Sequence, residues 1–266
     1  MSRLDKRFAE LRARNEKALV CFVTAGDPSE ERTVEIVETL ARAGADAVEI
    51  GLPFSDPLAD GPSIQASSQR ALELGMTTRK TLEVVRKIRA SVPDLPLILM
   101  TYYNPIRRYG LAQYARDARM AGADAHIVTD LTPEEAGPWK ACSDENGLET
   151  VFLLAPTSTA ARIEVVAKLS TGFVYCVSRT GVTGARQDVP VELTDVVARI
   201  RAHTKEPICV GFGVSAPEHV RQICGFADGA VVGSSLVDLI HRHRDDSSLI
   251  SKVYDYIRSL KQATAG

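Results

Sequence analysis

Two acidic residues in one short stretch have the setting that proton transfer requires. Glu49 lies in the apolar run Asp46–Ile50, and Asp60 follows in a proline-rich loop. Strand side chains alternate between the two faces of a sheet, so if Val48 and Ile50 face one side, Glu49 faces the other. Complete burial raises the pKa of a carboxyl group by up to about 3–5 units. A carboxyl group perturbed in this way can both donate and accept a proton near neutral pH, which makes Glu49 a candidate general acid and base.

Both acids also have a structural interpretation. A glutamate at a strand end can simply pair with a basic residue. Asp60 lies in a loop with Pro53, Pro57 and Pro62, whose rings fix φ and restrict the open chain. Aspartate is common in such loops as a turn former or helix cap, so the residues alone leave a structural and a catalytic role of Asp60 both open.

Glycine-rich segments follow three later apolar runs and favour an anion site. They are Ser178–Arg186 (SRTGVTGAR), Gly211–Ser215 (GFGVS) and Gly233–Ser235 (GSS). Glycine lets backbone N–H groups approach an anion, and the last segment opens a helical stretch whose N-terminus is the positive end of a dipole. Barrels often hold a phosphate between the loops after strands seven and eight. Together the segments predict a phosphate on the ligand, although the glycines could serve only tight turns.

The elements that must position these residues alternate along the whole chain. Eight short apolar runs are separated by amphipathic helical stretches, and near-continuous apolar runs are typical of parallel strands covered by helices. The pattern predicts an α/β fold, a closed (β/α)8 TIM barrel, with an open doubly wound sheet as the alternative. The expected strands are Ala18–Thr24, Asp46–Ile50, Leu95–Tyr102, Asp124–Asp130, Glu149–Ala155, Phe173–Ser178, Pro207–Gly213 and Asp228–Gly233.

Two further helices are expected outside the repeating pattern. Leu4, Phe8 and Leu11 recur at helical spacing and predict an amphipathic N-terminal helix packed on the barrel. The stretch Ser63–Glu73 predicts an extra short helix after the second strand. No linker rich in proline, glycine or serine divides the chain, so residues 1–266 are expected to form a single TIM-barrel domain.

Composition excludes several classes of protein. The chain has 266 residues, of which 45% are hydrophobic and 25% charged, with a formal net charge of −2. That charge balance lacks the basic stripe of a nucleic-acid-binding protein, and no apolar run approaches the roughly 20 residues that span a bilayer. Five cysteines without a CxxC pair or signal peptide predict reduced thiols in a cytoplasmic protein. The five histidines show no metal-ligand spacing, so no metal is expected.

Strand alternation also predicts what surrounds Glu49. Side chains of the same parity would form a flat, mostly apolar pocket with one carboxylate. A sugar-phosphate isomerase or epimerase would need a polar pocket, so this lining argues against it. The inward residues are expected to be Phe22, Thr24, Ile98, Met100, Tyr102, Leu153, Tyr175 and Phe212.

Taken in order along the chain, these motifs resemble those of the tryptophan synthase α subunit. The match covers nearly the whole chain, and its most specific part runs from Glu49 to Pro62. One departure is Thr132, where the family usually has a proline, which is expected to affect loop stiffness more than chemistry. The matching segments are FVTAGDP (22–28), GADAVEIGLPFSDPLADGP (44–62), MTYYNP (100–105), SRTGVTGAR (178–186), GFGVS (211–215) and VVGSS (231–235).

The resemblance implies cleavage of indole-3-glycerol phosphate to indole and glyceraldehyde 3-phosphate. It implies that Glu49 protonates C3 of the indole and helps to take the proton of the glycerol hydroxyl, while Asp60 stabilises positive charge at the indole N–H. Tyr175 would position the substrate, and Thr183 would bond to Asp60 when the loop after strand six closes. The resemblance places the indole among Phe22, Met100, Tyr102, Leu153 and Phe212, and the phosphate on Gly184, Gly213, Gly233 and Ser234.

A partner is implied as well. In this family a β subunit joins the α subunit in an α2β2 tetramer, takes over the indole, and makes tryptophan from it and serine with pyridoxal phosphate. No cofactor is implied for this chain. A free-standing lyase would share all these residues, whereas a mere allosteric activator would be expected to have lost Glu49 or Asp60. Phe54 is expected to be exposed, with folding back into the core as the alternative. The residues expected to touch the β subunit are Pro53, Phe54, Asp56 and Pro57, and Asn104 and Arg108 in a loop after strand three.

Overall fold

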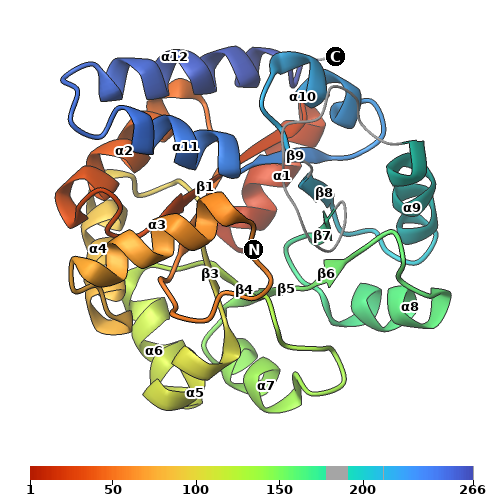
Figure 1. Ribbon diagram of the computed structural model, residues 1–266. Helices are drawn as coiled ribbons and strands as arrows, with labels where there is room; N and C mark the ends of the chain where they lie inside the picture. Colours follow the sequence, from red (N-terminus) through yellow and green to blue (C-terminus); the bar gives the residue numbers. More distant parts are fainter. Residues whose placement is uncertain (178–190, 212, 266) are drawn as a thin grey trace.

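A nearly closed barrel of parallel strands, surrounded by helices, forms the centre of the protein in the computed structural model (Figure 1). The structure describes residues 1–177, 191–211 and 213–265. The strands are β1 (Ala18–Thr24), β2 (Ala47–Gly51), β3 (Leu97–Thr101), β4 (Ala125–Val128), β5 (Glu149–Val151), β6 (Leu153–Leu154), β7 (Val174–Val177), β8 (Ile208–Gly211) and β9 (Gly229–Val232). They pair in parallel in the order β5–β4–β3–β2–β1–β9–β8–β7–β6.

The fifth expected strand is divided in two. Its halves, β5 and β6, stand at the two ends of the hydrogen-bonded order, yet only Phe152 separates them along the chain. The chain itself therefore completes the ring. All eight expected apolar runs contain a strand, and the predicted closed (β/α)8 barrel is confirmed over an open sheet.

Amphipathic helices cover the barrel, and local signals explain where several of them begin. The side chains of Ser2, Ser29, Thr77 and Thr159 each accept a hydrogen bond from a backbone N–H of the first turn, which otherwise lacks a partner. The helices are α1 (Arg3–Ala13), α2 (Glu30–Ala43), α3 (Pro62–Glu73), α4 (Thr78–Ser91), α5 (Tyr103–Tyr109), α6 (Leu111–Ala121), α7 (Gly137–Glu145), α8 (Ala160–Leu169), α9 (Val191–Arg201), α10 (Pro217–Cys224), α11 (Ser234–Arg242) and α12 (Leu249–Gln262).

The segment after β3 differs from expectation. Asn104 and Arg108 lie in helix α5 rather than in a loop. Pro105 is tolerated because it stands in the first turn, where its missing N–H costs no intrahelical hydrogen bond. Ile106 is fully buried in the core and gives this short helix its anchor.

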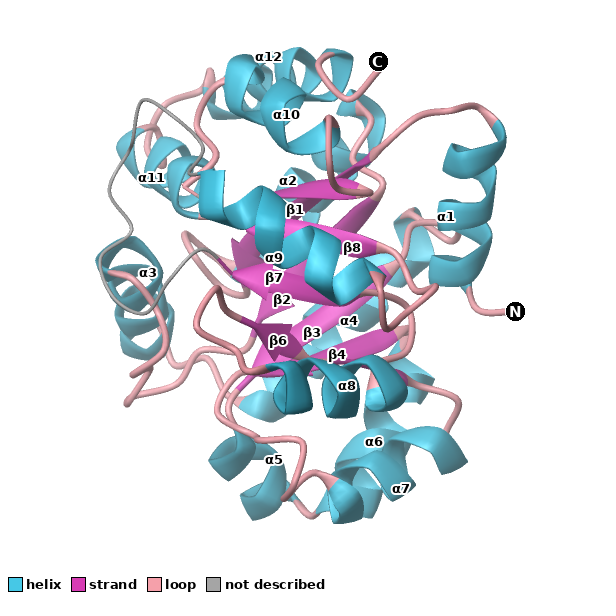
Figure 2. Cartoon of the chain, turned by 90° about the vertical axis from the view of Figure 1, so that its right-hand side faces the viewer, coloured by secondary structure: helices cyan, strands magenta, loops and turns pink. Residues whose placement is uncertain are grey.

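Two apolar clusters lie on the two sides of the strands. Leu4, Phe8 and Leu11 of α1 pack with inward strand side chains such as Ala47, so α1 closes the amino-terminal end of the barrel. Figure 2 shows α1 at one end of the barrel and α3 at the other. Val48 belongs to the outer cluster, between strands and helices. The predicted alternation in β2 is therefore confirmed, and both additional helices are present.

Three aspartates at the amino ends of strands tie neighbouring strands together. Asp46, Asp124 and Asp228 directly precede β2, β4 and β9. Each carboxylate accepts a hydrogen bond from a backbone N–H of the adjacent strand, so it aligns two strands at their start. The donors are Leu19 on β1 (2.8 Å), Leu97 on β3 (2.9 Å) and Ile208 on β8 (2.9 Å). Within the described ranges, no helix has the length and apolarity needed to cross a bilayer.

Candidate active site

Glu49 lies inside the barrel on β2, as its parity predicts. Its neighbours in the strand register are Phe22 on β1 and Ile98 on β3. The residue is 1% exposed, and its Oε1 accepts no hydrogen bond from the described part of the chain. Burial alone raises the pKa of Glu49 to about 8, with no contribution from a described cation. Pairing with a basic residue, the structural alternative, finds no support there.

Tyr175 on β7 is an aromatic neighbour of Glu49. Burial raises the pKa of its hydroxyl, and the charges of Glu49 and Asp60 add to that effect, so the side chain stays neutral. Its ring needs the absence of a side chain at Gly211, where a Cβ would lie 2.5 Å from the Tyr175 hydroxyl. Tyr175 can therefore serve as a fixed hydrogen-bonding group beside Glu49.

Asp60 stands in the loop between β2 and α3. Burial raises its pKa to about 6, although a hydrogen bond with the Tyr102 hydroxyl acts in the opposite direction. The same hydroxyl accepts the backbone N–H of Ala59 at 2.9 Å. Helix α3 is capped by Gly61 and has no side-chain cap, so Asp60 is not a helix cap. The helix-cap interpretation is therefore wrong, while the turn-forming and the catalytic role of Asp60 both stay predictions.

A cavity of about 150 Å³ opens at the carboxyl ends of the strands, with Asp60 in its wall. Met100, Leu153 and Tyr175 line it, as expected for the indole pocket. Phe22, Tyr102 and Glu49 itself are buried and lie outside this lining; Phe22 is the register neighbour of Glu49, and the Tyr102 hydroxyl is engaged by the loop. The contact of Phe22 and Tyr102 with the indole stays a prediction. Phe212 and Thr183 lie outside the described residues.

Several lining residues were not predicted from the sequence. Val177 stands two positions after Tyr175 on β7, so strand alternation could have identified it. Ile64 comes from α3 and carries no strand signal. The full lining is Ala59, Asp60, Gly61, Ile64, Met100, Thr129, Leu153, Tyr175, Val177, Gly211, Gly213, Val214, Val231, Gly233 and Ser234.

One wall of this cavity has the features of an anion site. Gly233 is the N-cap of α11 and Ser234 is its first residue. Gly213 has a φ of 39°, in the left-handed region that favours glycine. Backbone N–H groups in the first turn of a helix have no intrahelical partner and attract anions. Gly184, the fourth expected phosphate residue, lies outside the described residues.

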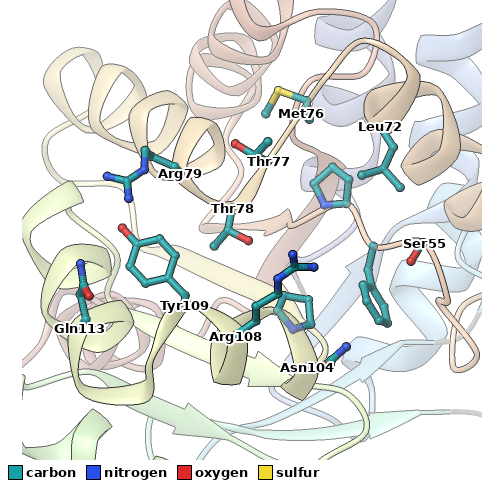
Figure 3. Close-up of a pocket in the computed structure, with 13 residues that line it drawn as sticks. Ser55, Leu72, Met76, Thr77, Thr78, Arg79, Asn104, Arg108, Tyr109 and Gln113 are labelled. Carbon is teal, nitrogen blue, oxygen red and sulfur yellow. The ribbon is translucent and has the colours of Figure 1, made fainter.

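A larger groove of about 740 Å³ lies next to the Asp60 loop, between that loop, α4 and α5 (Figure 3). Its lining includes Pro53, Phe54, Asn104 and Arg108, four of the residues expected to touch a partner. Asp56 and Pro57 lie outside the lining, and Asp56 is exposed. Phe54 is half-buried rather than exposed, because its ring packs 5.2 Å from that of Tyr102.

The fold and the site together define a (β/α)8 barrel with two acids of raised pKa at or near a cavity, one wall of which has the features of an anion site. The family model described as "Tryptophan synthase alpha chain" matches residues 8–265. The chain belongs to this family, whose members are lyases, and it is therefore a lyase.

Relatives and solved structures agree with the family model over the full length. The tryptophan synthase alpha chain of Solibacter usitatus is 47% identical over 262 residues, covering 98% of each chain. That of Geobacter sulfurreducens is 48% identical and covers 99% of each chain. The structure of the alpha subunit from Legionella pneumophila superposes with a TM-score of 0.92 at 36% identity, covering 99% of this chain and 98% of the other. A structure of Mycobacterium tuberculosis tryptophan synthase gives the same score and identity, covering 100% and 99%.

Proposed function

We propose that Glu49 and Asp60 carry out the reaction of this family in this chain, the retro-aldol cleavage of indole-3-glycerol phosphate to indole and glyceraldehyde 3-phosphate. The observation that supports this most is the isolation of Glu49 from any described cation. With a pKa of about 8, its carboxyl group is largely protonated at neutral pH and can give its proton to C3 of the indole.

In the proposed reaction Glu49 alone can give the one proton that is needed and take one back. Protonation of C3 places positive charge on the indole nitrogen, and the bond from C3 to the glycerol carbon then breaks. The electrons of that bond return to the ring, while the hydroxyl on the leaving carbon loses its proton and becomes the aldehyde. Glu49, now ionised, accepts that proton. Asp60, with a pKa of about 6, is mostly ionised at neutral pH and stabilises the charge at the indole N–H.

The substrate phosphate is proposed to bind backbone groups of Gly213, Gly233 and Ser234, with Gly184 and the Ser234 hydroxyl. The position of the first three in one cavity wall supports this. Thr183 remains the proposed partner of Asp60. The reaction needs no cofactor in this chain, because the protonated indole ring itself accepts the bond electrons.

The groove beside the Asp60 loop is proposed to dock a tryptophan synthase β subunit, in an α2β2 tetramer that passes indole to a pyridoxal-phosphate site in the β subunit. Pro53 and Phe54, in the loop that carries Asp60, face α5 across this groove. Leu58 in the same loop is 91% exposed, and an exposed leucine there suits a protein partner better than solvent. Docking and catalysis would thus share one loop.

Indole release by the purified chain, measured with and without a β subunit, tests the activity. We expect indole from indole-3-glycerol phosphate in both cases, and about 10²–10⁴-fold slower formation by the Glu49→Gln variant. Absence of indole formation under both conditions would contradict the proposal. The presence and burial of both acids oppose the alternative of a pure activator.

A matched pair of charge reversals tests the docking surface. Arg108 lines the groove, whereas its exposed neighbour Arg107 does not. Arg108→Glu should weaken β-subunit binding in titration calorimetry, and Arg107→Glu should change it little. If the wild-type chain forms no complex at micromolar concentration, the free-standing lyase is the better description.

A further inference from the structure

A pair of hydroxyl groups connects the two backbone segments of the proposed phosphate wall. Ser235 Oγ donates to the carbonyl oxygen of Val214 at 2.6 Å. Tyr256 donates its hydroxyl to Ser235 Oγ at 2.8 Å. Val214 directly follows Gly213, and Ser235 directly follows Ser234. One short chain of hydrogen bonds therefore joins the loop after β8 to the N-terminus of α11.

Tyr256 reaches this wall from the outer layer of the barrel. It lies on α12, which packs against both α10 and α11 (Figure 1). Its hydroxyl is also 3.3 Å from the carbonyl oxygen of Ser215, whose backbone N–H donates to Nδ1 of His219 at 3.3 Å. Burial raises the pKa of Tyr256, so the phenol stays neutral and keeps its proton for donation.

The glycines of this wall explain why such a connection is useful. Gly213 and Gly233 allow close approach to an anion, but glycine also has the largest conformational freedom to lose. An anion held by N–H groups from two segments binds well only if the segments keep a fixed separation. Neither Ser235 nor Tyr256 lines the cavity, so any effect they have on an anion is indirect.

We propose that Ser235 and Tyr256 are positioning residues, which hold the Gly213 and Ser234 segments at the separation that the substrate phosphate requires. This inference rests on the proposed function, which places the phosphate between these segments. It makes the two hydroxyls determinants of selectivity for a phosphorylated substrate, without a part in the proton transfers.

The readout that separates positioning from a general structural role is the phosphate dependence of the effect. Tyr256→Phe should raise KM for indole-3-glycerol phosphate by about 3–10-fold, the range for one neutral hydrogen bond, with kcat nearly unchanged. It should weaken the binding of inorganic phosphate by the same factor. With indoleglycerol, which lacks the phosphate, kcat/KM should stay at the wild-type value.

Four further variants sharpen the experiment. Ser235→Ala should reproduce the effect of Tyr256→Phe, and the double variant should lose little more, because both residues belong to one chain of hydrogen bonds. Ser235→Thr keeps a hydroxyl and should restore most of the phosphate affinity. Tyr254→Phe, a partly exposed site on the same helix, serves as the matched control and should have no effect.

The outcomes distinguish this inference from the proposed function. If inorganic phosphate binds wild type and Tyr256→Phe equally, or if both substrates lose the same factor in kcat/KM, the positioning role is wrong and the proposed function stands. If wild type binds no phosphate, both are wrong. Should Tyr256→Phe unfold, as judged by circular dichroism, the same comparisons with Ser235→Ala decide.

Discussion

Buried acids occur at both ends of this barrel, but their partners differ. At the amino ends of the strands, Asp46 and Asp124 are 3% and 1% exposed. Asp46 accepts Lys261 at 2.8 Å and Asp124 accepts Arg89 at 2.7 Å, each in addition to a backbone N–H. At the other end, Glu49 is equally buried and has no cation among the described residues.

The difference shows how one fold separates stability from chemistry. Burying an unpaired charge is costly, and a cation with hydrogen bonds offsets that cost. Burial raises the pKa of Asp46 as well, but Lys261 and the Leu19 N–H oppose the shift. Nothing described opposes it at Glu49, which therefore keeps its proton at neutral pH. The amino-end acids hold strands together as charges, whereas the proposed role of Glu49 is to store a proton for a substrate.

The largest expected effect is the loss of turnover in Glu49→Gln. Glutamine keeps the shape of the side chain but cannot transfer the proton, so indole formation should fall by about 10²–10⁴-fold. The fold should be retained, as checked by circular dichroism. Turnover near the wild-type rate would show that the unpaired acid has no catalytic role.

The matching change at the amino end should reverse this pattern. Asp124→Ala leaves Arg89 and Arg3 without their buried partner and removes the acceptor of the Leu97 N–H. We expect a loss of about 3–5 kcal/mol in the free energy of unfolding, measured with urea, and normal turnover per folded molecule. Asp144→Ala, which removes a 53% exposed carboxylate from its ion pair with Lys140, is the control and should cost at most about 1 kcal/mol. If Asp124→Ala lowered the free energy of unfolding no more than Asp144→Ala, the buried acid at the amino ends of the strands would have no special role in stability.

Asp60 should show a smaller effect that depends on pH. Its folded-state pKa of about 6 means that the carboxylate is lost as the pH falls through 6, so wild-type turnover should decline there. Asp60→Asn should turn over about 10²-fold more slowly at neutral pH and lack that decline, while phosphate binding stays largely intact. A parallel loss of phosphate binding would instead indicate a misfolded loop.

The smallest expected effect concerns stability as a function of pH. The pKa of Glu49 rises from 4.5 to about 8 on folding, so the folded state binds more protons than the unfolded state between these values. The free energy of unfolding should therefore decrease as the pH rises from about 4.5 to 8. Glu49→Gln removes this dependence and should be more stable than wild type at pH 7, by about 1–3 kcal/mol. Identical pH–stability curves for the two proteins would count against the raised pKa.

Features that depend on local pattern were predictable from the sequence, whereas features that depend on packing were not. The alternation of β2 placed Glu49 inside the barrel, because apolar neighbours on both sides left one parity for it. The expected fifth strand is apolar almost throughout, so no local pattern indicated that it is interrupted at Phe152, which is buried like a strand residue. The Asn-Pro pair of α5 reads as a turn, although Ile106 anchors a helix there.

Contacts between distant segments had no signal in the sequence. Nothing local indicates that Lys261 reaches Asp46, or that no described cation reaches Glu49. The link from Tyr256 to Ser235 likewise depends on how α12 packs over α11. The motifs of the proposed site could be recognised from the sequence because they lie at the ends of strands. The residues that set the pKa or the position of these side chains come from elsewhere in the chain.

The protonation of Glu49 is the central claim, and a direct titration tests it. Carbon-13 NMR of side-chain carboxyl groups, with the Glu49 signal assigned by its absence in Glu49→Gln, follows this group across pH. The unpaired burial of Glu49 predicts an apparent pKa of about 8 in the folded protein. A titration near the ordinary glutamate value of about 4.3 would contradict the account, because Glu49 would then be ionised at neutral pH and have no proton to give.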